Sequence, residues 1–166
     1  MSDYFKRVQA KTRTQFWINN VTEEEAHLAI ENGAVGCTQN PSYGYKMLVH
    51  PTQSGRSMEI LRQVLKEESD DDMAAVAFQR EMVSKIAAIF REVYDKTNGE
   101  YGYVSIQGTP FDESYDTIMR LAHYNREAGD NIMIKIPATD DGIKAIEQCV
   151  SEGIPVNCTE VMSMAQ

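Results

Sequence analysis

Short apolar runs and longer amphipathic runs alternate along the chain. The short runs are typical of buried strands and lie at residues 15–19, 34–38, 101–107, 131–139 and 155–159. The longer runs place apolar residues at helical spacing and lie at residues 22–32, 58–66, 73–95, 112–128 and 142–152. Strands that alternate with helices in this way predict βαβ units and a parallel sheet.

Local signals mark where several of these helices begin and end. Thr22 can cap the first helix, and Glu25 three residues later completes a capping box. Gly33 follows the last periodic residue and stops the same helix. The acidic run at residues 67–72 predicts a solvated turn between two helices. Residues 161–166 predict the opening of a further helix.

The order of the elements indicates an α/β fold. The strand-and-helix units follow one another without a linker or a low-complexity segment, so we expect a single domain over residues 1–166. An open doubly wound sheet could finish within this length. A complete (β/α)₈ barrel could not, because it normally needs about 250 residues.

The net charge narrows the range of partners. The chain carries a formal charge of −9, which argues against general affinity for nucleic acid or for an anionic membrane. A small anionic substrate is still allowed, because a local site can oppose the global charge. The sequence has no apolar signal region at its N-terminus and no run of membrane-spanning length, so we expect a cytoplasmic protein.

The cysteine and histidine residues give no sign of a metal site. They follow no metal-ligand spacing and are Cys37, Cys149, Cys158, His27, His50 and His123. Reduced thiols and packing or surface histidines are the expected roles. No Gly-rich phosphate loop is present in the sequence either.

Lys135 is the residue that most clearly suggests chemistry. It stands in the apolar run of residues 131–139, where a charged ammonium is costly to bury unless it is paired or loses its proton. A neutral amine can attack a carbonyl group and form a Schiff base. The alternative is a strand lysine that extends its charged end to the solvent or pairs with a carboxylate.

Polar residues stand near the C-terminal ends of all the predicted strands. They are Asn19, Asn40, Gln107, Lys135 and Thr159. Ligands bind at this edge in parallel α/β folds. Each residue alone has an ordinary explanation as a turn, a cap or a β-former. Together, on successive strands, they predict a site.

Several segments resemble the signature segments of the transaldolase family. They are CTQNPS at residues 37–42, IMIKIPAT at 132–139, GIPVNCT at 153–159 and SMAQ at 163–166. The resemblance runs in register from about residue 15 to residue 166. It implies a TIM (β/α)₈ barrel, here with only its first five β/α units. It also implies transfer of a dihydroxyacetone unit between sugar phosphates in the pentose phosphate pathway, with no metal or organic cofactor.

The resemblance also assigns roles to single residues. Lys135 matches the lysine that forms the Schiff base, and Thr159 matches the threonine that helps to hold the catalytic water. Asn40 matches the asparagine that binds the hydroxyls of the dihydroxyacetone unit, with Thr38 of the same segment as a second expected substrate-binding residue. Gln107 falls where transaldolases carry a glutamate and the related fructose-6-phosphate aldolases carry a glutamine.

Asn19 departs from the family pattern at an important position. Both groups of enzymes place there an aspartate that moves the proton during carbon–carbon cleavage, and an amide cannot accept that proton near neutral pH. Glu160 is the carboxylate nearest to Thr159 in the sequence. Strand alternation directs it away from the face of Thr159, which argues against Glu160 as a replacement.

The length leaves several alternatives open. The last three strands of the barrel, and the residues that grip the substrate phosphate, have no counterpart in the sequence. We expect part of a longer protein; the alternative is a five-stranded protein stabilised as a homo-oligomer, because open sheet edges invite association. The functional alternatives are a transaldolase, a fructose-6-phosphate aldolase-like lyase, a sugar-phosphate-binding member without turnover, and a fragment without activity.

Overall fold

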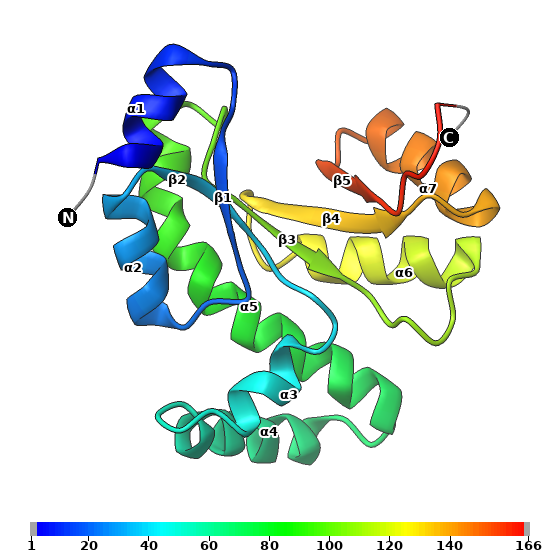
Figure 1. Cartoon of the computed structure of the whole chain (residues 1–166). Helices are drawn as coiled ribbons and strands as arrows, with labels where there is room; N and C mark the ends of the chain where they lie inside the picture. Colours follow the sequence, from blue (N-terminus) through cyan, green and yellow to red (C-terminus); the bar gives the residue numbers. More distant parts are fainter. Residues whose placement is uncertain (1–2, 165–166) are drawn as a thin grey trace.

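A curved sheet of parallel strands forms the centre of the computed structural model, which describes residues 3–164 (Figure 1). The strand order follows the chain, and every neighbouring pair is parallel. The strands are β1 Phe16–Asn19, β2 Ala34–Thr38, β3 Tyr103–Gln107, β4 Ile132–Pro137 and β5 Val156–Thr159. A doubly wound sheet would reverse this order at a switch point. The fold is therefore five units of a TIM barrel, as the resemblance implied.

The helices lie between these strands in the order that the apolar pattern predicts, with two additions. They are α1 Tyr4–Lys11, α2 Glu23–Glu31, α3 Tyr43–Leu48, α4 Ser54–Glu67, α5 Asp71–Lys96, α6 Tyr115–Arg126 and α7 Asp140–Ser151. The sequence pattern did not predict α1 or α3. Contacts to distant residues explain α1, because Phe5 stacks on Phe16 at 4.2 Å between ring centroids and Gln9 donates to the Gly33 carbonyl.

The predicted ends of the helices agree with the structure in some places and differ in others. The capping box of α2 is confirmed, with Thr22 Oγ1 accepting from the Glu25 amide and Glu25 accepting from the Thr22 amide. Gly33 ends this helix at φ +96°, a conformation that favours glycine. The acidic run at residues 67–72 is largely exposed and joins two helices as predicted, but the connection is shorter than the run, because α4 takes in Glu67 and α5 begins at Asp71. Asp70 caps α5 by accepting from the amide of Met73. Residues 161–164 form no helix, and residues 165–166 lie outside the described range.

One face of the sheet packs against the helices and forms the core. The side chains of β3 and β4 on this face are at most 3% exposed and are Val104, Ile106, Ile132, Ile134 and Ile136. Residues of α5 join them in one hydrophobic cluster, including Ile86 and Phe90. Burial of these apolar side chains is the main source of stability in such a fold.

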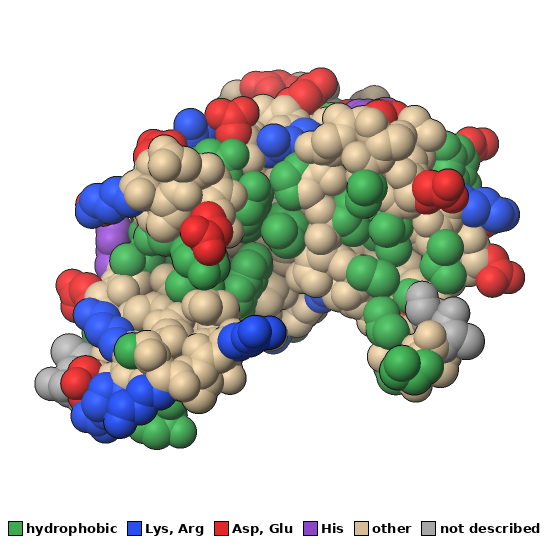
Figure 2. Space-filling model, turned by 90° about the horizontal axis from the view of Figure 1, so that it is seen from above, with side chains coloured by type: hydrophobic (Ala, Val, Ile, Leu, Met, Phe, Trp, Pro, Cys, Tyr) green, Lys and Arg blue, Asp and Glu red, His purple; other side chains and the backbone are tan. Residues whose placement is uncertain are grey.

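The other face of the sheet lines a hollow. Figure 2 shows the molecule as an arch that is open on one side. Because successive strand residues point to opposite faces, Met133 and Lys135 point away from the buried face and are only partly buried. Trp17 lies on this inner face over Gly36, where a Cβ atom would stand 2.8 Å from the indole ring. On this inner face, Trp17 and Gly36 are closely packed, and the C-terminal ends of the strands carry polar side chains.

Replacing Phe90 tests the assignment of the core. Phe90 is fully buried, so we expect Phe90→Ala to lower the free energy of unfolding by about 3–5 kcal/mol, through lost burial and the cavity left behind. Phe111 is 91% exposed, and Phe111→Ala is expected to change the same quantity by less than about 0.5 kcal/mol. Urea denaturation of both variants measures the difference, and equal effects would contradict this core.

Candidate active site

The ends of the strands meet at one edge of the sheet, as the sequence predicts. The register pairs Thr38 of β2 with Asn19 of β1 on one side and with Ser105 of β3 on the other. Farther along the sheet, Gln107 pairs with Lys135. Paired residues of parallel strands point to the same face, so Gln107 and Lys135 both project from the inner face of the sheet.

Lys135 makes its closest polar contact with Asn40. Its Nζ donates to Asn40 Oδ1 at 2.7 Å, although the two residues are 95 positions apart in the sequence. The backbone of Asn40 is held in turn by two side chains. Its amide donates to Asn20 Oδ1 at 2.9 Å, and its carbonyl accepts from Gln79 Nε2 at 3.4 Å. The amide oxygen of Asn40 is thus fixed at the amine of Lys135.

Burial changes the acidity of Lys135. The side chain is partly buried, and this desolvation lowers the pKa of Lys135 below its ordinary value, because the charged form loses water. The carboxylate of Glu160 acts in the opposite direction and raises the pKa of the lysine. Desolvation is the larger effect, so a greater share of Lys135 is neutral amine than in an exposed lysine.

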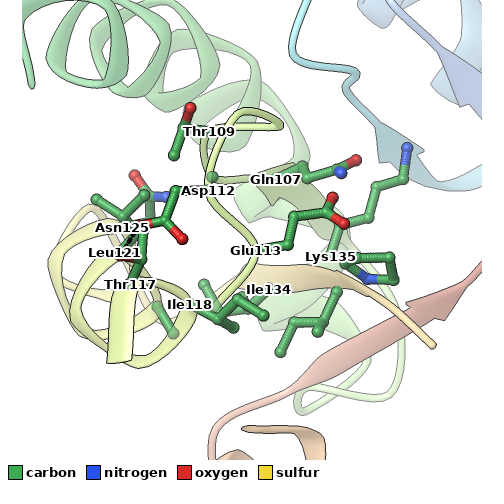
Figure 3. Close-up of a pocket in the computed structure, with 14 residues that line it drawn as sticks. Gln107, Thr109, Asp112, Glu113, Thr117, Ile118, Leu121, Asn125, Ile134 and Lys135 are labelled. Carbon is green, nitrogen blue, oxygen red and sulfur yellow. Dashed lines mark hydrogen bonds between the residues drawn. The ribbon is translucent and has the colours of Figure 1, made fainter. Parts of the chain in front are cut away.

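A pocket opens beside Lys135, between the end of the sheet and α6 (Figure 3). Lys135 and Gln107 form part of its wall, together with Glu113 from the loop that follows β3. Ile134 and Ile118 supply apolar surface. The cavity measures about 20 Å³, which is room for about one water molecule, and the polar side chains of Lys135, Gln107 and Glu113 stand in its wall.

The remaining predicted residues lie farther from the amine. Thr159 ends β5 and pairs with Pro137, and its Oγ1 donates to the carbonyl of Ile136 at 3.4 Å. Asn19 ends β1 and is exposed. Within residues 3–164, no hydrogen bond joins Asn19 or Thr38 to Lys135. The structure thus brings Asn40, Gln107 and Lys135 together, and it places Thr159 one strand away and Asn19 at the far edge.

Asn157 is a polar residue beside Lys135 that the sequence pattern did not single out. It is the direct neighbour of Lys135 on β5, and its Nδ2 donates to Ser105 Oγ at 3.3 Å across the inner face. Strand alternation could have found it, because Asn157 and Thr159 must point to the same face. Asn20, which holds Asn40, was hidden because it follows β1 at φ +50°, outside the strand pattern.

Within residues 3–164, no group of three His, Cys, Asp or Glu side chains could hold a metal ion, and no helix could span a membrane. The thiol of Cys37 on β2 is also unsuited to chemistry. Burial raises the pKa of Cys37 to about 12, so its thiol stays protonated at neutral pH. Of Cys37 and Lys135, only the lysine has a pKa that is shifted toward its nucleophilic form.

Comparison with known proteins gives consistent matches. A family model described as Transaldolase/Fructose-6-phosphate aldolase matches residues 16–166. A protein named Transaldolase from Neisseria gonorrhoeae is 31% identical over 161 residues, which cover 92% of this chain and 45% of that protein. A Transaldolase from Acidothermus cellulolyticus is 32% identical over 158 residues, which cover 89% and 41%. A Transaldolase 2 from Nostoc sp. is 43% identical over 79 residues, which cover 46% and 21%.

These matches agree with the architecture. The matched residues begin at the first residue of β1 and include every strand of the partial barrel. The chain spans less than half the length of these relatives. The chain belongs to the transaldolase/fructose-6-phosphate aldolase family.

Proposed function

We propose that this chain carries the Schiff-base lysine of a transaldolase-type enzyme, with Lys135 as the nucleophile. The proposed reaction transfers a dihydroxyacetone unit between sugar phosphates, a step of the pentose phosphate pathway in carbohydrate metabolism. The contact between Lys135 Nζ and Asn40 Oδ1 is the observation that supports it best. It joins an amine of lowered pKa to a hydrogen-bonding side chain at the strand edge where barrel enzymes bind their substrates.

The first step needs the neutral form of the lysine. The nitrogen lone pair of Lys135 attacks the ketose carbonyl carbon and gives a carbinolamine, which takes up a proton and loses water to become a protonated imine. Desolvation of Lys135 favours the amine that starts this step. Gln107, beside Lys135 in the register, and Thr159 on β5 are proposed to hold the water that leaves and later returns.

The second step breaks a carbon–carbon bond. The C4 hydroxyl loses its proton, the electrons of the C3–C4 bond move toward the imine, an aldehyde leaves, and an enamine stays on Lys135. Asn40 and Thr38 are proposed to bind the hydroxyls of this enamine. Addition of the enamine to a second aldehyde completes a transfer, and water then releases the new ketose from the lysine.

A fructose-6-phosphate aldolase-like lyase is the second candidate. Gln107 favours it, because a glutamine at this position resembles that branch of the family more than the transaldolases. In that case protonation and hydrolysis of the enamine release free dihydroxyacetone. Asn19 motivates a third candidate, a member that binds sugar phosphate without turnover, because an amide cannot take the proton of the C4 hydroxyl.

Borohydride trapping tests the proposed nucleophile. The purified full-length protein is incubated with fructose 6-phosphate and reduced, and mass spectrometry locates the adduct. We expect one dihydroxyacetone or ketose adduct on Lys135 and none in Lys135→Met. Lys144→Met is the matched control, since Lys144 is exposed on α7 and pairs with Asp141. Absence of any adduct on Lys135 in the wild type would overturn the proposal.

Steady-state turnover separates the candidates. A transaldolase is expected to form sedoheptulose 7-phosphate from fructose 6-phosphate only when erythrose 4-phosphate is added. A lyase is expected to release dihydroxyacetone from fructose 6-phosphate alone. Chromatography of the products distinguishes the two. Formation of either product at an unchanged rate by Lys135→Met would contradict both.

The Asn40 contact predicts how the reactivity of Lys135 depends on pH. Asn40→Asp places a carboxylate at the position of the amide oxygen, 2.7 Å from Nζ in the wild type, and an opposite charge stabilises the ammonium. The pKa of Lys135 should rise, so the midpoint of its acetylation by an amine-reactive reagent should move to higher pH. Peptide mass spectrometry measures this midpoint, and an unchanged value would mean that the contact does not form in solution.

A further inference from the structure

A carboxyl group lines the same pocket as the side chain of Lys135. Glu113 follows β3 in the loop that leads to α6, and it lines the pocket together with Gln107 and Lys135. Figure 3 shows its carboxyl group turned toward Gln107 and the side chain of Lys135. It is partly buried, so it is not simply a surface charge.

The residue before it, Asp112, has a different and structural role. Its Oδ1 accepts from the amide of Ser114 at 3.1 Å, and its Oδ2 accepts from Thr117 Oγ1 at 2.5 Å. These bonds lower the pKa of Asp112. Burial, and the negative charge of Glu160, raise the pKa of Glu113. Two adjacent acids thus differ in environment: Asp112 is stabilised as a carboxylate by hydrogen bonds near the start of α6, and Glu113 keeps its proton more readily than an exposed glutamate.

Glu160 is the charge that links this carboxyl group to the lysine. β5 ends at Thr159, and Glu160 follows at φ +60°, in the left-handed region. Glu160 is therefore not a residue of the strand, and strand alternation does not decide where its side chain points. Glu160 interacts electrostatically with both Lys135 and Glu113.

On the basis of the transaldolase-type function proposed above, we propose that Glu113 is a further catalytic acid of the Lys135 site. Glu113 lies in the loop that follows β3, the strand that carries Gln107 beside Lys135. It supplies proton transfer in a chain where neither Asn19 nor Gln107 can supply it.

The proposed step is the dehydration of the carbinolamine. Glu113 gives its proton to the carbinolamine hydroxyl, the C–O bond breaks, and water leaves while the nitrogen lone pair forms the C=N bond. The product is the protonated imine on Lys135 and a Glu113 carboxylate. In the reverse direction, the carboxylate takes a proton from the attacking water. No other reactant is needed, and the proton returns when the imine is hydrolysed.

Glu113→Gln tests this role by the rate of borohydride-trapped adduct formation. General acid catalysis is worth about 10²–10⁴-fold, so we expect the rate constant to fall by about 10²-fold or more. Glu113→Asp should recover part of the rate, and added acetate should recover part of it in Glu113→Ala. Glu147→Gln, an exposed carboxylate on α7, is the matched control and should keep the wild-type rate.

Glu160→Gln gives a readout that a structural role would not move. Within residues 3–164, Glu160 is the charged group that shifts the pKa of Lys135, Glu113 lines the same pocket, and β2 and β3 contribute the neutral Asn40 and Gln107. Removing the charge of Glu160 should lower the pKa of Lys135 and also that of Glu113. Both limbs of the pH–rate profile should therefore move to lower pH, whereas Glu147→Gln should leave both unchanged.

The outcomes separate this inference from the function on which it rests. If the wild type forms no adduct on Lys135, the proposed function fails. If the wild type forms the adduct and Glu113→Gln forms it at the same rate, the function stands and the catalytic role of Glu113 is overturned. A profile that Glu160→Gln leaves in place, or moves to higher pH, would contradict the assignment of its two limbs to Lys135 and Glu113. Circular dichroism of each variant checks that a lost rate does not come from misfolding.

Discussion

The site depends on the cost of keeping the charge of Lys135 partly out of water. This cost lowers the pKa of the lysine, and only Glu160 opposes it among the groups that shift that pKa. The sheet determines how large the cost is. One face of β4 is buried under the helices, and the other lines the hollow, so Lys135 is neither sealed in the core nor free in solvent.

The rest of the edge is arranged around this amine. Asn40 reaches it from β2 because the backbone after that strand is tied to Asn20 and Gln79. Gln107 is the register partner of Lys135 on β3, and Asn157 is its partner on β5. The parallel strands thus bring together residues that are far apart in the sequence. The chain belongs to the transaldolase/fructose-6-phosphate aldolase family, and the chemistry proposed for these residues rests in part on that membership.

Much of this arrangement could be predicted from the sequence, because it follows from periodicity. The strand at residues 34–38 agrees with β2 at both ends, and the Thr22 capping box forms as its spacing predicts. What could not be predicted depends on contacts or on unusual backbone. The helix α1 is held by tertiary contacts such as the stacking of Phe5 on Phe16. The alternation of side chains along a strand does not apply to Glu160, because this residue follows the end of β5 at a positive φ.

A direct titration of Lys135 tests the central claim most simply. Nuclear magnetic resonance of ¹³C-labelled lysine side chains can follow Lys135 and Lys144 in one sample, with Lys135→Met to assign the signal. Burial lowers the pKa of Lys135, whereas the hydrogen bond and charge of Asp141 raise that of Lys144. Lys135 should therefore lose its proton at clearly lower pH than Lys144. If Lys135 loses its proton at the same pH as Lys144 or at a higher pH, the amine is not more available for attack than that of an exposed lysine, and this explanation of the site is wrong.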